Sequence, residues 1–138
     1  MAAHAAPLIE LSEGVGPALA GDSIVHLDAR SDNLLVTPEG VRIVDWPWAC
    51  RGAPWFDALG LALNARLYDP VADLTAHLRA VADLGGTPEQ VDAVLAVLLG
   101  LFLHGSAQPP PPGLPTLRAF QHAQGAVLTA WLRTRLAG

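Results

Sequence analysis

The chain has 138 residues, of which 51% are hydrophobic and 15% are charged, a composition that excludes an intrinsically disordered protein and is long enough for one domain with a core. Its net charge is −5 and its eight basic residues form no cluster, so neither a nucleic-acid partner nor a basic binding surface is expected. The single cysteine, Cys50, excludes an intramolecular disulfide and a zinc site built from cysteines.

The N-terminal residues show no basic segment followed by a long apolar run, so no signal peptide is predicted. The most apolar run, Ala93–Leu103, has 11 residues, whereas about 20 are needed to span a bilayer. This run is therefore interpreted as part of a buried helix. A cytoplasmic protein with no membrane partner is expected.

The first half of the chain predicts short strands. Residues 7–20 have the spacing of a short helix, which Gly14, Gly16 and Pro17 weaken. The apolar run 23–27 is typical of a strand that enters a polar loop. Residues 33–37 and 41–46 flank the turn sequence Pro-Glu-Gly, which predicts a β-hairpin. Residues 47–55, rich in proline and tryptophan, are expected to form an ordered but irregular loop.

The second half predicts helices. Apolar residues recur at helical spacing from Phe56, and Asp69 followed by Pro70 is typical of a helix start, for a second helix that ends before Gly85-Gly86. Thr87 opens a capping-box sequence before a helix that is apolar on nearly every side and is expected at the centre of the core. After a proline-rich connection, a last helix is predicted over about 116–136. Strands followed by helices indicate an α+β fold.

Four polar residues stand out beside the hairpin: His26, Asp28, Asn33 and Asp45. Phosphoryl transfer from ATP needs a carboxylate that orients a hydroxyl and accepts its proton. It also needs hard oxygen ligands for the divalent metal that bridges the phosphates. The predicted hairpin begins at Asn33 and ends at Asp45, so both side chains can face one metal site from neighbouring strands.

At these residues the chain resembles a known family. The segment "HLDARSDN" followed by "IVDW" is similar to the catalytic loop and metal-binding segment of the aminoglycoside phosphotransferase family, whose fold is protein-kinase-like. The resemblance implies the C-terminal lobe of such a fold, with ATP and Mg²⁺ as cofactors and a small-molecule hydroxyl as substrate. It makes Asp28 the catalytic base, and Asn33 and Asp45 the residues that bind the metal and, through it, the nucleotide.

The resemblance also gives roles to neighbouring residues. His26 would be mainly structural, and Trp46 would take the aromatic position after the metal-binding aspartate. The segment "GAPWFDALGLAL" is similar to the family's G-x-P-x-x-D-L-A, so Asp57 would begin a helix and accept hydrogen bonds from the catalytic-loop backbone. Arg30 matches a position where protein kinases often keep a lysine near the transferred phosphate, which makes it a second catalytic candidate; the alternative is an ion pair with Asp28 or Asp32.

The chain departs from the family pattern in three respects. Leu27 stands where the family usually has glycine, no lysine is present to contact the ATP phosphates, and an N-terminal nucleotide lobe is expected to be absent. Residues 1–138 are expected to form a single domain, with the catalytic loop, hairpin and metal segment in 21–57 and a helical subdomain in 58–138. The expected partners are the missing lobe or a second copy that covers the exposed cleft face.

For several other residues a purely structural interpretation is favoured. Asp32 is interpreted as a solvated loop residue, and the tryptophans at 46, 48 and 55 as residues that close the core rather than a stacking platform. The histidines at 77, 104 and 122 are interpreted as packing or helix-surface residues. Two other functions remain open: a non-catalytic kinase-like fragment that acts as an interaction module or is a degenerate gene product, and metal-dependent hydrolysis through His26 and Asp28.

Overall fold

The structure is a computed structural model in which residues 5–137 are described, and it has an α+β composition, as the sequence predicts. The chain forms two compact units. One consists of the chain up to Ala18 together with the chain from Pro88 onward, and the other consists of Leu19–Thr87. The polar residues singled out above all belong to the second unit, which holds the strands.

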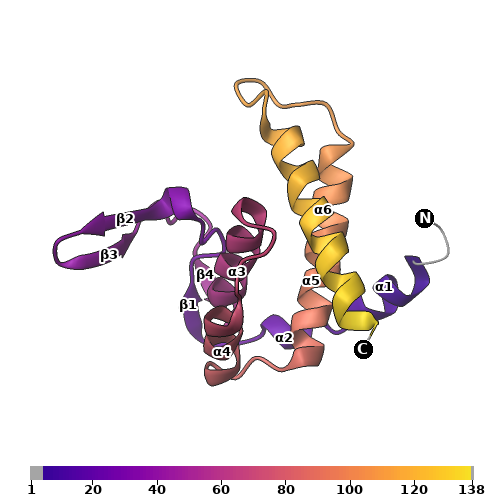
Figure 1. The fold of residues 1–138 in the computed structure, drawn as a ribbon, viewed down its shortest axis with the longest axis horizontal. Coiled ribbons are helices and arrows are strands. Elements are labelled where there is room, and N and C mark those ends of the chain that lie inside the picture. Colours follow the sequence, from indigo (N-terminus) through magenta and orange to yellow (C-terminus); the bar gives the residue numbers. More distant parts are fainter. Residues whose placement is uncertain (1–4, 138) are drawn as a thin grey trace. The chain divides into compact units, whose positions relative to one another are not determined.

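The unit Leu19–Thr87 contains two separate two-stranded sheets. Strand β1 (Ser23–Val25) pairs antiparallel with β4 (Cys50–Gly52), and β2 (Leu34–Thr37) pairs antiparallel with β3 (Gly40–Ile43). A short 3₁₀ helix, Ser31–Asn33, leads directly into β2. The β2–β3 hairpin projects away from the β1–β4 pair and from the helix that follows them (Figure 1).

The predicted hairpin is confirmed, with Thr37 opposite Gly40 across a two-residue turn. The prediction of an irregular loop over residues 47–55 is wrong, because β4 lies within it. Two glycines make this pairing possible. A Cβ atom on Gly21 would lie 2.4 Å from the carbonyl oxygen of Gly52, so the two backbones approach more closely than a side chain at position 21 would permit.

Two helices complete this unit: α3 (Phe56–Tyr68) and α4 (Thr75–Asp83). Their buried apolar face confirms the predicted stripe in α3, where Leu59 and Leu63 are buried. The predicted helix start at Asp69-Pro70 is wrong. The Asp69 carboxylate instead accepts the backbone N–H of Val71, which closes a local turn.

The true start of α4 lies six residues further on. The Asp73 carboxylate accepts hydrogen bonds from the backbone N–H and the hydroxyl of Thr75, at 2.9 and 2.6 Å. These bonds satisfy a donor that the first turn of a helix leaves without an intrahelical partner. Both hydrogen bonds lower the pKa of the Asp73 carboxyl, the one from the Thr75 hydroxyl more than the one from its N–H.

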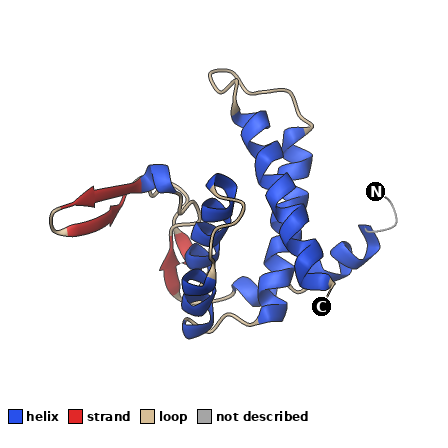
Figure 2. Ribbon diagram, in the orientation of Figure 1, coloured by secondary structure: helices blue, strands red, loops and turns tan. Residues whose placement is uncertain are grey.

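The other unit is helical (Figure 2). It contains α1 (Ala5–Ser12), most of α2 (Val15–Leu19), α5 (Pro88–Ser106) and α6 (Leu117–Leu136). A single helix over residues 7–20 is wrong, because the chain turns between α1 and α2, where Gly14 donates its N–H to the carbonyl of Leu11. The predicted last helix is confirmed as α6, which packs side by side with α5, while α1 packs on α5.

Helix α5 supplies most of the core of this unit. Its buried residues are Val91, Ala93, Val94, Leu95, Ala96, Leu99 and Gly105. The expectation of a helix buried on nearly every side is wrong near its C-terminal end, because Leu101 and Leu103 are exposed. Within residues 5–137, α5 is the one helix whose length and apolar composition would allow it to cross a membrane. A third of its most apolar stretch is buried.

Candidate functional site

His26 joins the predicted catalytic loop to the end of the hairpin. Its side chain is fully buried, and its Nε2 lies 2.9 Å from the carbonyl oxygen of Val44. The backbone N–H of Asp28 donates to Nδ1 at 3.3 Å, so Nδ1 is the acceptor and Nε2 carries the ring proton. The Trp46 ring meets the imidazole edge-on, with centroids 4.7 Å apart. This histidine therefore has a structural role: it links the loop to the end of the hairpin, and neither ring nitrogen is left to act on a substrate.

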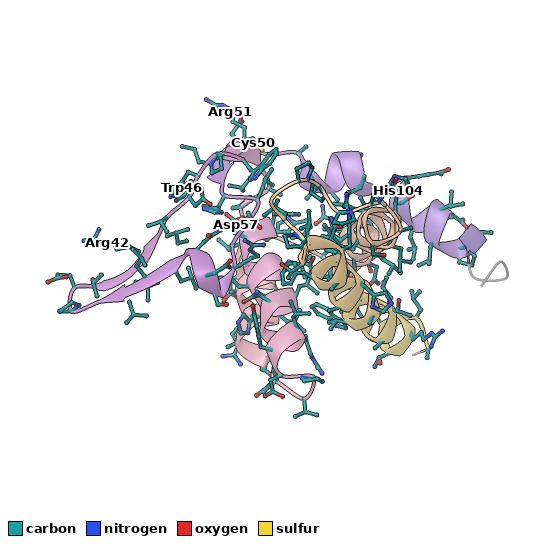
Figure 3. The ribbon with its side chains drawn as sticks, turned by 90° about the horizontal axis from the view of Figure 1, so that it is seen from above. Arg42, Trp46, Cys50, Arg51, Asp57 and His104 are labelled. Carbon is teal, nitrogen blue, oxygen red and sulfur yellow. The ribbon has the colours of Figure 1, made fainter. Side chains whose placement is uncertain are left out.

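Asp57 holds the start of the same loop. It lies in the first turn of α3 (Figure 3). Its two carboxylate oxygens accept the backbone N–H groups of His26 and Leu27, at 2.7 and 3.0 Å. Hydrogen bonds to an ionised acceptor are about twice as strong as neutral ones. The hydrogen bonds that the sequence predicts between Asp57 and the loop backbone are thus present.

Leu27 adopts a backbone conformation that favours glycine. Its φ angle is 67°, in the left-handed region that costs an L-residue roughly 1–2 kcal/mol. The residue stands where the resembled family has glycine, and the loop follows the backbone path that a glycine would take. The Leu27 side chain is 40% exposed, so it avoids crowding by pointing outward. The hydrogen bonds to Asp57 and to the His26 ring hold this strained turn in place.

The Asp28 carboxylate lies between two donors. Arg30 approaches it with Nε at 3.4 Å from Oδ1, and the Asn33 amide nitrogen lies 3.4 Å from Oδ2 and 2.9 Å from the Asp28 carbonyl oxygen. Arg30 also pairs through Nη2 with Asp32 at 3.0 Å. About a third of the Asp28 side chain remains exposed. The carboxylate is thus oriented by the chain and still open to solvent on one side.

Both ion pairs weighed for Arg30 are therefore present. Asp32, whose side chain is 61% exposed, is a solvated loop residue as predicted, and it also takes part in the pairing. Exposed ion pairs of this kind contribute little to stability, since water and salt screen them. Their effect here is geometric, because they hold a guanidinium group beside the Asp28 carboxylate.

Asn33 and Asp45 come together at the open end of the hairpin. The backbone N–H of Val44 donates to the carbonyl of Asn33 at 3.0 Å, which extends the β2–β3 ladder by one residue. Asn33 is buried, and its amide nitrogen donates to the Asp28 carbonyl oxygen. Its amide oxygen, Oδ1, therefore points away from Asp28. Asp45 is exposed and has a φ angle of 64°, so the chain turns sharply there. The hairpin thus places Asn33 and Asp45 at the same end, and their joint role as metal ligands stays a prediction.

Comparison with protein-family models, with curated proteins and with solved structures finds no match to this chain. The interpretation of the site therefore depends on its own geometry and on the motif resemblance.

Sequence reasoning missed one side chain that contacts the loop. Asn64 is buried in α3, and its Oδ1 accepts the backbone N–H of Ser31 at 3.1 Å. A signal was present: Asn64 is the one polar residue in the apolar run Ala58–Ala65, and it follows Asp57 by seven residues. Seven residues are nearly two helical turns, so the two side chains share a face.

The remaining candidates lie as follows. Trp55 is buried and closes the core as predicted, whereas Trp48 is 68% exposed and the same prediction is wrong for it. Trp46 is about half exposed and covers His26, with its indole N–H donated to the carbonyl of Ile43. Cys50 is exposed. Among residues 5–137, no three histidine, cysteine, aspartate or glutamate side chains gather as a metal site.

Proposed function

We propose that the unit Leu19–Thr87 carries the catalytic loop and metal segment of a cytoplasmic phosphotransferase that uses ATP and Mg²⁺ to phosphorylate a hydroxyl of an aminoglycoside- or amino-alcohol-like molecule. The unit would be part of the C-terminal lobe of a protein-kinase-like fold. The observation that carries the proposal is the network around Asp28. Hydrogen bonds to Asp57 and to the Val44 carbonyl fix the backbone and ring of His26 beside it. Asn33 and Arg30 approach the Asp28 carboxylate itself, which stays about a third exposed.

Asp28 would act as the general base in this reaction. Its carboxylate would orient the substrate hydroxyl and accept its proton, which is the task that phosphoryl transfer leaves to a protein carboxylate. Arg30, at 3.4 Å from that carboxylate, would place positive charge beside the transferred group. The His26 ring, with both nitrogens engaged, would support the loop and take no part in proton transfer.

The donors at the hairpin end fit a magnesium ion bound together with phosphates. Mg²⁺ prefers oxygen ligands and is usually held by one or two protein groups, with phosphates and water completing the shell. Asn33 would offer its amide oxygen and Asp45 its carboxylate. Mg²⁺ with ATP would supply the phosphoryl group and offset its charge.

The hairpin surface also supports the proposal. Val36 and Val41 lie opposite each other in the hairpin and are exposed on strands that no other strand in the described residues covers. Under the proposal, a lobe that covers the nucleotide would dock against this apolar surface, and it would come from residues outside this sequence or from another chain. A second copy could cover the same surface in its absence. Sedimentation as a monomer at high protein concentration would argue against both.

Phosphate transfer tests the proposal. The protein is incubated with radiolabelled ATP, Mg²⁺ and a panel of amino-alcohols and aminoglycosides, and labelled product is measured. Transfer should fall by about 10²–10⁴-fold in Asp28→Asn, which removes the base and keeps the shape of the side chain. Asp22→Asn is the control, because the Asp22 side chain is 96% exposed and its ion pair is with Arg51, whose side chain is 75% exposed. The function would be refuted if neither this chain nor a complete protein that contains it transfers phosphate.

A second candidate function is a kinase-like module without catalysis, which binds a partner and no nucleotide. The observation that favours it is the absence of lysine, the residue that contacts the ATP phosphates in the resembled family. Calorimetric titration with Mg-ATP separates the two candidates. Binding in the micromolar range, weakened in Asp45→Asn, would rule out the non-catalytic module.

A further inference from the structure

The helix α3 contacts the predicted catalytic loop at two points, and the second one has no counterpart in the motif. Asp57 accepts the N–H groups of His26 and Leu27, at the loop's beginning. Asn64 accepts the N–H of Ser31, at its end. Two side chains on one face of one helix therefore hold both ends of the segment that carries the catalytic candidates.

The loop lies directly on the helix between these two points. Gly60, one turn after Asp57, faces the loop: a Cβ atom placed on it would lie 3.7 Å from the Ala29 carbonyl oxygen, an ordinary contact. Ala29 is buried, while its neighbours Asp28 and Arg30 are each about a third exposed. Arg30 has an extended backbone, in which successive side chains point to opposite sides. Packing of Ala29 on α3 therefore turns its two neighbours outward.

The hydrogen bond from Ser31 to Asn64 fixes the point where the extended loop becomes a 3₁₀ helix. Ser31 is the first residue of that helix, so its N–H has no partner within it. Asn64 supplies the acceptor from a side chain that is only 8% exposed and is therefore held by its surroundings. Arg30 directly precedes Ser31, so this bond limits how far the guanidinium can move relative to the Asp28 carboxylate.

We propose that Asn64 is a positioning residue: it sets the geometry between Arg30 and Asp28 by anchoring the end of the loop. Its effect on reaction rate rests on the phosphotransferase function proposed above, whereas its effect on the loop does not. Asn64 acts through the backbone of Ser31.

The test compares three substitutions. Asn64→Leu keeps the approximate size of the side chain and removes the acceptor, and Asn64→Asp restores an acceptor oxygen. Gln124→Leu is the matched control, because Gln124 is another buried amide with 8% exposure but lies in α6, outside this unit. Amide hydrogen exchange measured by NMR reports on the Ser31 N–H separately from the Leu27 N–H, which Asp57 holds.

Asn64→Leu should speed exchange at Ser31 by roughly tenfold, the loss expected for one hydrogen bond, and leave Leu27 within about twofold. Asn64→Asp should return Ser31 to near the original rate, and Gln124→Leu should leave it unchanged. In the transfer assay, Asn64→Leu should lower kcat by roughly tenfold with KM within about twofold, and Asn64→Asp should recover most of it.

Three results would overturn the proposal: unchanged exchange at Ser31 in Asn64→Leu, an equal rise at Ser31 and Leu27, or an unchanged kcat in a protein that transfers phosphate. If Ser31 loses protection selectively but neither the unmodified chain nor a complete protein that contains it transfers phosphate, the anchoring of the loop is supported and the phosphotransferase function is refuted. The two failures are therefore distinguishable.

Discussion

Replacement of Asp57 by alanine tests whether α3 holds the loop. The substitution removes two charge-assisted hydrogen bonds, of 2.7 and 3.0 Å, and leaves two backbone N–H groups without their acceptor. The His26 donor belongs to a fully buried residue, and loss of its bond should cost about 2–3 kcal/mol; the Leu27 donor can turn to water, and its loss should cost about 1 kcal/mol. Loss of a carboxylate from the first turn of α3 adds roughly 0.5 kcal/mol, which the higher helix propensity of alanine offsets.

The net expectation for Asp57→Ala is a loss of about 3 kcal/mol in the free energy of unfolding. Urea denaturation followed by the fluorescence of buried Trp55, which directly precedes α3, gives the midpoint and slope that this comparison needs. Asp22→Asn is the control and should change stability by less than about 0.5 kcal/mol. A loss in Asp57→Ala no larger than in the control would show that the two hydrogen bonds do not hold the loop, and the reasoning would fail.

Three further predictions concern packing and charge. Gly21→Ala should destabilise the Leu19–Thr87 unit by more than about 2 kcal/mol, because its Cβ atom would lie 2.4 Å from the Gly52 carbonyl oxygen. Gly100→Ala should instead stabilise the protein by about 0.5–1 kcal/mol, because Gly100 lies in a helix and its added Cβ atom would have no atom within 4 Å. Thermal unfolding of both variants tests this, and equal effects would contradict the close approach at Gly21. Leu95→Ala should cost about 2–5 kcal/mol in denaturant unfolding, because the side chain is fully buried, and a cost below 1 kcal/mol would contradict that burial. The lowered pKa of Asp73 means that its hydrogen bonds to Thr75 stabilise α4 at neutral pH and lose that effect as the pH falls through the acid range. Stability measured from pH 7 to pH 2 should therefore fall less steeply in Asp73→Asn, and equal slopes would count against the bonds.

The elements that could be predicted from sequence are those with a strong local pattern. Helices α5 and α6 have long apolar periodicities, and the hairpin is marked by Pro-Glu-Gly between alternating runs. Strand β4 could not be found this way. It has three residues, and it pairs with Ser23–Val25 across a long sequence separation, which no local pattern records.

The start of α4 shows a competition that sequence alone does not decide. Asp69-Pro70 and Asp73 both offer a carboxylate ahead of a helix-forming run. The side chain of Asp69 is used in a turn with Val71, while that of Asp73 binds Thr75. Both arrangements satisfy one backbone donor, and tertiary packing of Leu74 selects the later start.

The sequence identifies the residues of the candidate site better than the hydrogen bonds that hold them. The motif indicates Asp28, Asn33, Asp45 and Asp57, and the hydrogen bonds of Asp57 follow from the resemblance. The carbonyl of Val44 and the side chain of Asn64 do not belong to any motif. A backbone carbonyl has no sequence signature, and a buried asparagine is identified as a loop anchor only when the loop is seen above it.

Leu27 has a consequence for the order in which this sequence can change over generations. Its left-handed backbone is held by hydrogen bonds to Asp57, whereas glycine would adopt the same φ angle at no steric cost. A chain with glycine at this position should tolerate loss of the Asp57 carboxylate better than the present chain. Replacement of Asp57 is therefore expected to cost less stability when Leu27→Gly precedes it, and the four combined genotypes would show this as a cost of the double change smaller than the sum of the single ones.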